Sequence, residues 1–351
     1  MKNSCWLALI LAFCALTMVG CKRKQVLHVY TWADYFAPEV VEEFEKKFDC
    51  VVKQDIFDSN EMMFAKLQAG GAGYDIIVPT HYFIGKMVNE KMLTPLDKAK
   101  LPNLQHLDTS VIQGLNPLVL EYAVPYFLGY TGLGYSKEAL PDFEGTWDVF
   151  LNEKLRGRMT LLDDYIEIFG ALSCKLGYSV EDLCDPEKGD ERMEELVALA
   201  LKWRPNIIKF ENEQYKNGLS AGEFLAVMGY SSDLGQIVDE SPETLGFVMP
   251  KEGCLMCCDT LVIPATAPNV DLAYEFINFL YEPEMCAKNI TDVHAYTPNT
   301  AAKALLDEET LNNSSIFIAP DVLAKSAFVP ELSPEQEARF LKYWNRIKAG
   351  E

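Results

Sequence analysis

Strand-like and helix-like segments alternate through the first hundred residues, and this alternation restricts the fold more than any other feature. Helical spacing of apolar residues follows a short β-branched or aromatic run each time. Strands are expected at residues 27–32, 50–55 and 74–79, with helices beginning near Pro38 and Ser59. This order predicts βαβ units and a mainly parallel sheet.

A second α/β set follows an aromatic, glycine-rich segment at residues 118–135 that is expected to be extended. Further strands are expected at residues 158–162, 224–230, 245–249 and 260–264, and helices at residues 166–176, 190–203, 271–280 and 340–347. We therefore predict two α/β lobes, each a mainly parallel sheet flanked by helices. Extended hinge crossings would join them and place a cleft between them.

Ligands of parallel sheets bind beyond the carboxyl ends of the strands. That rule places residues 32–35 and 80–82 at one rim of the first lobe. Both segments are rich in aromatic and hydroxyl side chains, so this rim is the first candidate for a binding site.

The N-terminus carries the features of an export signal. An uncharged apolar run at residues 6–19 follows Lys2 and is shorter than the roughly 20 residues that span a bilayer. The sequence MVGC at residues 18–21 resembles a bacterial lipobox, in which Cys21 would be lipidated. We expect a signal peptide at residues 1–20 and a tether at 21–25; cleavage into a soluble secreted form is the alternative.

The formal net charge is −21. Such a surface argues against nucleic acid, whose phosphates require a basic face, and it favours cations over anions. Seven cysteines remain beyond residue 21, an odd number in a chain that needs no disulfide framework. They are expected to be small buried residues or to include one disulfide, because the cluster at 254–258 lacks a second pair for zinc.

Enzyme motifs are scarce. The glycines at residues 70–73 follow a helix and precede a strand, the reverse of a phosphate-binding loop. Of the four histidines, His81 lies at the predicted rim, where a polar contact is a simpler role than catalysis. Asp163, Asp164 and Glu167 could form a carboxylate or metal site, but no complementary nucleophile or base accompanies them.

Several runs resemble the periplasmic spermidine/putrescine-binding proteins of ABC importers. They are YTWADY (30–35), SNEMMFAKL (59–67), YDIIVPTHY (74–82), LDDYIEIF (162–169), LGY (176–178), PKEG (250–253), Asp259, IP (263–264) and TPN (297–299). The resemblance extends from about residue 26 to the C-terminus. It implies a class II periplasmic-binding-protein fold, with residues 26–130 and 257–300 in lobe 1 and residues 131–256 and 301–351 in lobe 2.

The same resemblance implies a set of ligand-binding residues. The first lobe would supply Trp32, Tyr35, Thr80 and Tyr82, the second lobe Asp164 and Glu167, and the crossing strand Asp259. Carboxylates suit the ammonium groups of a polyamine, and aromatic faces suit both its methylenes and its charges.

The chain departs from the family pattern at several wall positions. Gly229 and Cys257 stand where the family has Trp, with Tyr230 next to the first. Ala295 stands where the family has Tyr, with Tyr296 displaced by one residue. Glu331 is a guess for the family's far-end glutamine. We therefore include Tyr230 and Tyr296 in the predicted site.

Some of these residues also have structural explanations. Trp32 and Tyr35 could be packing aromatics, and Asp164 and Glu167 could stabilise the start of a helix. A buried Asp259 needs a partner, which could be a neighbouring Lys or Arg instead of a ligand.

We predict a polyamine-binding, non-enzymatic component of an ABC importer, located in the periplasm and anchored to a bacterial membrane by its lipid. The expected partners are the polyamine, the permease and ATPase of the inner membrane, and the membrane itself. No cofactor, metal or nucleic acid is expected, and the chain would act as a monomer. The alternatives are a binding protein of this fold for another solute, a carboxylate–metal hydrolase, and a scaffold or adhesin.

Overall fold

The computed structural model describes residues 24–351, so the predicted signal peptide and Cys21 lie outside the described residues. Within this range, ten strands form one mixed sheet in the order β2-β1-β3-β9-β4-β7-β5-β6, with β10 beside β9 and β8 beside β4. The strands are β1 (Gln25–Thr31), β2 (Cys50–Ile56), β3 (Ile76–Ile77), β4 (Ala123–Ser136), β5 (Met159–Leu161), β6 (Ile207–Phe210), β7 (Ala226–Tyr230), β8 (Leu245–Val248), β9 (Leu255–Val262) and β10 (Ala327–Phe328).

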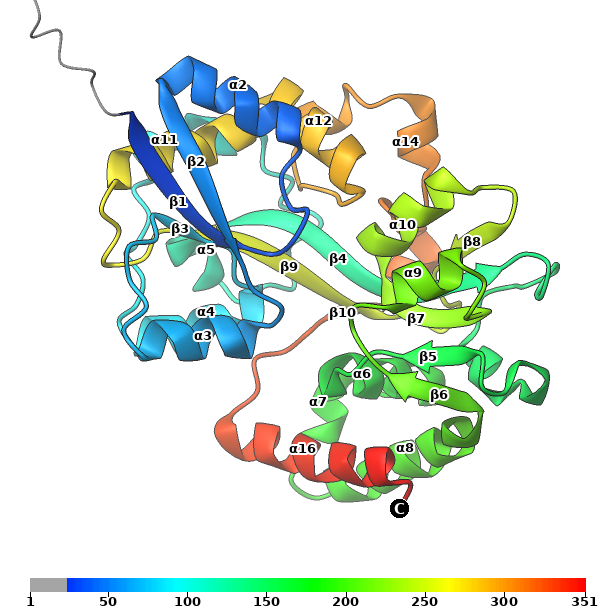
Figure 1. Ribbon diagram of the computed structural model, residues 1–351. Coiled ribbons are helices and arrows are strands. Elements are labelled where there is room, and N and C mark those ends of the chain that lie inside the picture. Colours follow the sequence, from blue (N-terminus) through cyan, green and yellow to red (C-terminus); the bar gives the residue numbers. More distant parts are fainter. Residues whose placement is uncertain (1–23) are drawn as a thin grey trace, which may run out of the picture.

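Helices cover both faces of the sheet at each end (Figure 1). The longer helices are α2 (Pro38–Phe48), α3 (Asn60–Gln68), α4 (Ile84–Asn89), α6 (Tyr165–Leu176), α8 (Gly189–Trp203), α9 (Tyr215–Ser220), α10 (Ser231–Glu240), α11 (Val270–Leu280), α12 (Pro283–Val293) and α16 (Pro334–Ala349). The single-turn helices are α5 (Val119–Tyr122), α7 (Val180–Leu183), α13 (Thr300–Lys303), α14 (Glu308–Asn312) and α15 (Pro320–Leu323). The 3₁₀ turns are η1 (His81–Phe83), η2 (Lys98–Lys100), η3 (Pro102–His106), η4 (Trp147–Leu151), η5 (Glu153–Leu155) and η6 (Arg204–Asn206).

The first half of the sheet carries β1, β2 and β3 as parallel neighbours. One face packs against α2 and α11 through a fully buried aliphatic and aromatic cluster that includes Val29, Phe44 and Phe276. The opposite face packs against α3 and α4 through Phe64 and Ile84, among others. The second half joins β5 to β6 and β7 in parallel and lies between α9 and α10 on one side and α6 and α8 on the other (Figure 1).

The long strand β4 belongs to both halves. Its first part, Ala123 to Tyr130, runs antiparallel to β9. From Thr131 onward its partners become β7 and β8. Figure 1 shows β4 and β9 crossing the centre of the molecule side by side, so these two strands connect the halves. The assignment of the remaining segments to two lobes stays a prediction.

Local sequence signals explain most element boundaries. The Ser59 side chain accepts a hydrogen bond from the N–H of Met62 and caps α3, as predicted. Gly70 follows that helix with φ +92°, a conformation that glycine adopts without strain. Asp164 caps α6, and Gly177 ends it in the left-handed conformation.

Several boundaries differ from the predictions, among them β3, which spans only Ile76–Ile77, and α16, which begins at Pro334; two differences have a clear cause. Residues 119–122 form α5 rather than extended chain, because the Asn116 side chain accepts the N–H of Leu118 and starts a helical turn. Strand β9 begins at Leu255 rather than at residue 260, because its pairing with β4 extends into the cysteine-rich segment. That pairing is a long-range contact, which residue composition alone does not reveal.

Within residues 24–351, no helix combines the length and apolar character that crossing a bilayer requires. The seven cysteines in this part of the chain are free thiols, four of them buried. None of the described cysteines therefore crosslinks the two halves.

Candidate ligand-binding site

Asp259 lies at the centre of the first half's contribution to the site. It is carried by β9 and keeps 7% of its surface exposed. One carboxylate oxygen accepts a hydrogen bond from the Thr80 hydroxyl at 2.6 Å, and the other accepts one from the Tyr35 hydroxyl. Burial raises the pKa of Asp259 to about 6, and the two hydroxyl donors oppose that rise.

Thr80 and Tyr82 are held by one buried amide. The Asn60 side chain accepts the backbone N–H of Thr80 at 3.0 Å and donates to the Thr80 hydroxyl at 2.9 Å. It also donates to the Tyr82 hydroxyl at 3.2 Å. Asn60 begins α3, so this helix positions Thr80, which precedes η1, and Tyr82 within η1.

Trp32 and Tyr35 come from the loop that follows β1. The Trp32 indole N–H donates to the carbonyl of Val78 at 2.9 Å. The Tyr35 ring packs edge-on against Phe127, at 5.2 Å between centroids, while its hydroxyl reaches Asp259. Both rings keep part of their surface exposed, so they are not simply core aromatics.

Asp164 and Glu167 occupy the first turn of α6 in the other half. Asp164 accepts the N–H groups of Ile166 and Glu167 at 2.8 and 3.2 Å. It is therefore a helix cap, the structural role that the sequence offered as an alternative to ligand binding. Both bonds use one oxygen and leave the other free. Glu167 caps nothing; one of its oxygens accepts the hydroxyl of Thr131 on β4, and 7% of its surface is exposed.

Burial raises the pKa of both α6 carboxyls above the ordinary range. For Glu167, the neighbouring charge of Asp164 adds to the effect of burial. Two like charges this close disfavour full ionisation of both groups. A cation placed between them would remove that penalty.

The β4–β9 ladder links the two groups of carboxylates. Asp259 lies opposite Phe127, and Cys257 lies opposite Gly129. Thr131, which holds Glu167, follows Phe127 by four residues, which is about 13 Å along a strand. A side chain at Gly129 would crowd the Cys257 sulfur, at 2.9 Å from the added carbon. The thiol thus fills the middle of this ladder, on the same face as Asp259.

Tyr82 and Tyr230 bring the two halves together. Burial raises the pKa of Tyr82, and the charge of Asp164 from the other half raises it further. The pKa of Tyr230 is raised by burial, then by the charges of Asp164 and Glu167. Both rings remain partly exposed. Tyr230 therefore lies within electrostatic reach of the α6 carboxylates, and its role in binding stays a prediction.

The structure does not bring Tyr296 into this group. Its ring is buried against Phe317, and its hydroxyl donates to Asp108 at 3.3 Å. The exposed Glu331 lies against Gly85 of α4. Neither contacts another predicted site residue through a hydrogen bond, an ion pair or ring packing in the described part of the chain. Their binding roles stay predictions.

The Gly229 departure from the family pattern has a packing reason. A side chain at Gly229 would meet the ring of Tyr215 at 2.5 Å. Tyr215 is fully buried, and its hydroxyl donates to Asp233 and accepts the N–H of Tyr230 at 3.3 Å. Tyr215 therefore occupies the space that a larger residue at 229 would need, and it positions Tyr230.

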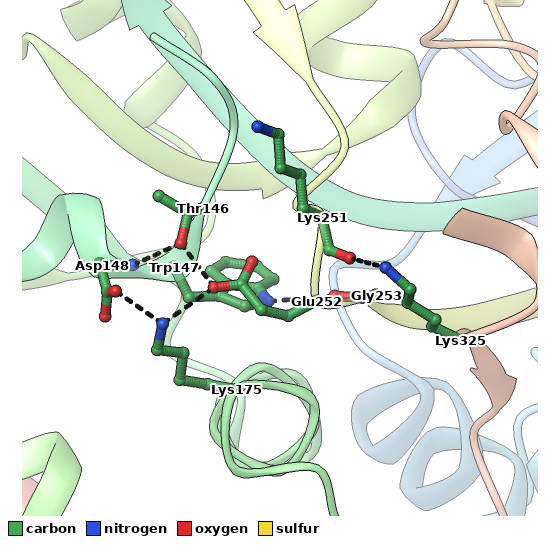
Figure 2. A network of polar contacts seen from close by, with 8 residues as sticks. All are labelled: Thr146, Trp147, Asp148, Lys175, Lys251, Glu252, Gly253 and Lys325. Atoms are coloured by element: carbon green, nitrogen blue, oxygen red, sulfur yellow. Dashed lines mark hydrogen bonds and ion pairs between the residues drawn. The ribbon is translucent and has the colours of Figure 1, made fainter. Parts of the chain in front are cut away.

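The end of α6 is tied to the loop before β9 by a network of polar contacts (Figure 2). Lys175, in the last turn of α6, contacts Asp148 at 2.6 Å and Glu252 at 3.1 Å. Glu252 lies in the loop that leads into β9 and also accepts the Thr146 hydroxyl at 2.5 Å. Gly170 lets α6 approach Leu255 at the start of β9, since an added carbon would lie 2.3 Å from its side chain. These contacts fix α6 relative to β9.

No lysine or arginine in residues 24–351 pairs with Asp164, Glu167 or Asp259. The proposed alternative for Asp259, a neighbouring cation, is therefore not found among the described residues. Asp163 lies on the surface and pairs with Lys348 at 2.7 Å. No described group of three metal-binding side chains forms, so the hydrolase alternative gains no support.

Two residues of the site were missed from the sequence. Asn60 lies inside the SNEMMFAKL run but was counted only as part of a helix motif, although a buried Asn signals a specific hydrogen-bonding role. Thr131 lies in the glycine-rich extended segment, where nothing in the local pattern marks it. Its role depends on how the fold places β4 against the first turn of α6.

Comparisons with known proteins identify relatives along nearly the whole chain. Residues 39–317 match the family model described as "Bacterial extracellular solute-binding protein". The chain is 34% identical to a putrescine-binding periplasmic protein of Pseudomonas aeruginosa, covering 98% of this chain and 97% of the relative. It is 32% identical to a putrescine-binding periplasmic protein of Escherichia coli, covering 93% and 92%.

Solved structures give the same picture. The spermidine/putrescine ABC transporter substrate-binding protein of Streptococcus pneumoniae superposes with a TM-score of 0.82 at 29% identity, covering 92% of this chain and 99% of that one. A lipoprotein of Treponema pallidum gives the same TM-score, identity and coverage. The predicted periplasmic-binding-protein fold is confirmed.

Proposed function

The chain belongs to the bacterial extracellular solute-binding proteins, and on that premise we propose that it captures a polyamine such as putrescine or spermidine for an ABC importer. The ligand would lie along the β4–β9 ladder between the two halves. Its ammonium groups would meet Asp259 at one end and the α6 carboxylates at the other.

One observation carries this proposal. Three carboxylates from two halves of the molecule are buried or half-buried without a lysine or arginine partner in residues 24–351. A buried anion without a cation costs several kcal/mol, so such groups normally pair. A ligand with two or more ammonium groups supplies the missing charge at both ends.

The remaining groups suit the rest of a polyamine. Charge-assisted hydrogen bonds contribute about 1.5–3 kcal/mol each. Aromatic faces hold cations with about 0.5–2 kcal/mol and cover methylenes as well. Trp32, Tyr35, Tyr82 and Tyr230 present partly exposed rings for this purpose. The separation of the carboxylates along the ladder would select for ligand length.

Binding and release, without chemistry, complete the proposal. The family and the relatives are solute-binding proteins. The two relatives compared in sequence are periplasmic. We propose that residues 1–20 direct export, that Cys21 carries a lipid, and that a permease and an ATPase of the inner membrane receive the ligand from a monomer.

Isothermal titration with putrescine, spermidine and glutamate tests the assignment. The purified mature chain should bind at least one polyamine with micromolar or tighter affinity, about −8 kcal/mol or better, and should not bind glutamate. Asp164→Asn should weaken binding at least tenfold. Asp163→Asn is the matched control: its carboxylate is the sequence neighbour but pairs with Lys348, so affinity should stay unchanged.

Absence of polyamine binding by the native chain would overturn the proposal. Equal losses for Asp163→Asn and Asp164→Asn would show that only general negative charge matters. Binding of Ca²⁺ or Mg²⁺ with no response to polyamine would favour the hydrolase alternative instead.

A further inference from the structure

We propose that Asn60 is a positioning residue. It sets the direction in which two hydroxyls of the first half's binding face, those of Thr80 and Tyr82, donate their hydrogen bonds. It would do so by donating to two hydroxyls, so that each hydroxyl must turn its own proton toward the ligand site. This inference rests on the proposed function only for its ligand. The hydrogen-bond geometry stands by itself.

The orientation of the Asn60 amide follows from a backbone group. The Thr80 N–H can only donate, and it lies 3.0 Å from one side-chain atom of Asn60, which must therefore be the carbonyl oxygen. The other atom is then the NH₂ group, which lies 2.9 Å from the Thr80 hydroxyl and 3.2 Å from the Tyr82 hydroxyl. Both N–H bonds of the amide are used.

This amide determines what Thr80 can do. The Thr80 oxygen accepts from Asn60, so its single proton is available for Asp259 at 2.6 Å. A continuous chain of donors thus runs from Asn60 through Thr80 to the carboxylate. Hydrogen bonding to the charged form stabilises the carboxylate as an anion, which is the form that binds an ammonium group.

Tyr82 receives the second N–H of the same amide. Its own proton is then free to point away from Asn60, toward the side of the site where the α6 carboxylates influence it. Asn60 is 3% exposed, so water does not compete freely for these bonds. One buried side chain would thereby orient donors toward both ends of the ligand.

The titratable groups that interact with Asp259 are Tyr35 from the loop after β1 and Cys257 and Cys258 from β9. Next to these lie His81, which accepts the Cys258 N–H, Tyr126 beside Tyr35, and Tyr82 and Glu167 on the side of Cys257. Burial lowers the pKa of His81 to about 4, so this ring is neutral above pH 5. Burial raises the pKa of the tyrosines and thiols, which stay neutral below pH 8. Asp259 and the α6 carboxyls are therefore the groups of this set that titrate between pH 5 and 8.

The test is Asn60→Asp, which keeps the acceptor for the Thr80 N–H but removes both donors. The new carboxylate competes for the Thr80 proton and leaves Asp259 without it. We expect polyamine affinity at pH 7 to fall about tenfold, or about 1.4 kcal/mol. The acid midpoint of binding should move up by about one pH unit. Asn60→Ala, which adds no charge, should shift both in the same direction by a smaller amount.

A double-variant cycle separates positioning from simple repulsion between charges. If Asn60 acts through the Thr80 hydroxyl, Asn60→Asp should add little to the pH shift of Thr80→Val. A full additional shift in the Thr80→Val background would overturn the proposal. Asn206→Asp is the control, because Asn206 is equally buried but bonds Phe150 and Arg156 away from the site. It should lower Tm without moving the acid midpoint.

The pKa of Asp259 in the ligand-free chain provides a test that does not depend on polyamine binding. An NMR titration of the Asp259 carboxyl carbon, assigned with Asp259→Asn, should show the same upward shift in Asn60→Asp. An unchanged Asp259 titration would overturn the positioning role even if polyamines bind. Absence of polyamine binding by the native chain, with the NMR shift present, would overturn the proposed function alone.

Discussion

The two ends of the candidate site hold their carboxylates in different ways. Asp259, on β9, receives one hydroxyl from Thr80 and another from Tyr35. On α6, Asp164 receives two backbone N–H groups, whereas Glu167 receives only the hydroxyl of Thr131 and faces the charge of its neighbour. The first end is a single anion with donors on both oxygens. The second is a repelling pair in which each carboxylate receives its donors on only one oxygen.

This difference distinguishes a carboxyl group that is charged before the ligand binds from a pair that becomes fully charged only when the ligand binds. Asp259, with a pKa of about 6, is mostly ionised at neutral pH before any ligand arrives. The raised pKa values of the α6 pair mean that it holds less than two full charges until a cation enters. The β9 end would therefore present a standing charge, while the α6 end would gain charge as the ligand binds.

The difference between the two ends is tested most directly by neutralising the carboxylate of one end at a time. Asp259→Asn should weaken polyamine binding by about 300-fold at pH 7, or ~3.4 kcal/mol, because it leaves an ammonium group facing an amide in a buried site. Glu167→Gln should cost only about tenfold, because this carboxyl is already partly protonated. Titration calorimetry on both variants measures the ratio, and equal losses would contradict the distinction.

Stability of the ligand-free protein provides the next test. The pKa of Asp259 is about 6 in the fold against an ordinary 3.8, so the folded state binds the extra proton. The contribution of Asp259 to the free energy of unfolding is therefore fully present below pH 4 and is lost as the pH rises through 6. Relative to the native chain, Asp259→Asn should gain up to ~3 kcal/mol between pH 4 and pH 8.

Urea unfolding at several pH values measures this gain. The comparison of two pH values cancels any fixed cost of the substitution itself. Asp163→Asn, whose native carboxylate is exposed and ion-paired, is the control and should show no such gain. A constant difference between Asp259→Asn and the native chain across this range would show that burial does not raise the Asp259 pKa.

The smallest expected effects concern Tyr230 and Tyr296, each of which lies next to a position where the family has an aromatic residue. Tyr230 lies beside the α6 carboxylates, so Tyr230→Phe should weaken binding about fivefold through loss of one hydrogen bond, or ~1 kcal/mol. Tyr296→Phe should change affinity less than twofold, since its hydroxyl contacts Asp108. A larger loss for Tyr296→Phe would restore this residue to the site.

Local patterns were sufficient for much of the fold. The Ser59 cap, the glycine stop at Gly70 and the strand–helix alternation of the first hundred residues all depend on neighbouring residues, and all are confirmed. Two errors have different causes. The early start of β9 depends on a distant contact, its pairing with β4. The turn that forms α5 depends on a local one, the bond from the Leu118 N–H to Asn116, which precedes the segment predicted to be extended.

The site divides in the same way. The strand-end rule placed Tyr35 at the rim of the site, whereas Asp164 and Asp259 came from the resemblance to the polyamine-binding proteins. Thr131 and Asn60 could not be chosen from type alone, since threonine and asparagine serve many local roles. Their importance depends on which side chains the fold places opposite them, such as Glu167 across from Thr131.

The change of partner along β4 has a mechanical consequence. Tyr130 pairs with β9, while the next residue, Thr131, pairs with β7 and holds Glu167. If the halves close over a ligand, as the two-lobe prediction expects, β4 would bend where its partner changes, and the Thr131 hydroxyl would move with it. The predicted point of bending would then be the residue that holds Glu167, so closure would directly reposition a carboxylate of the proposed site.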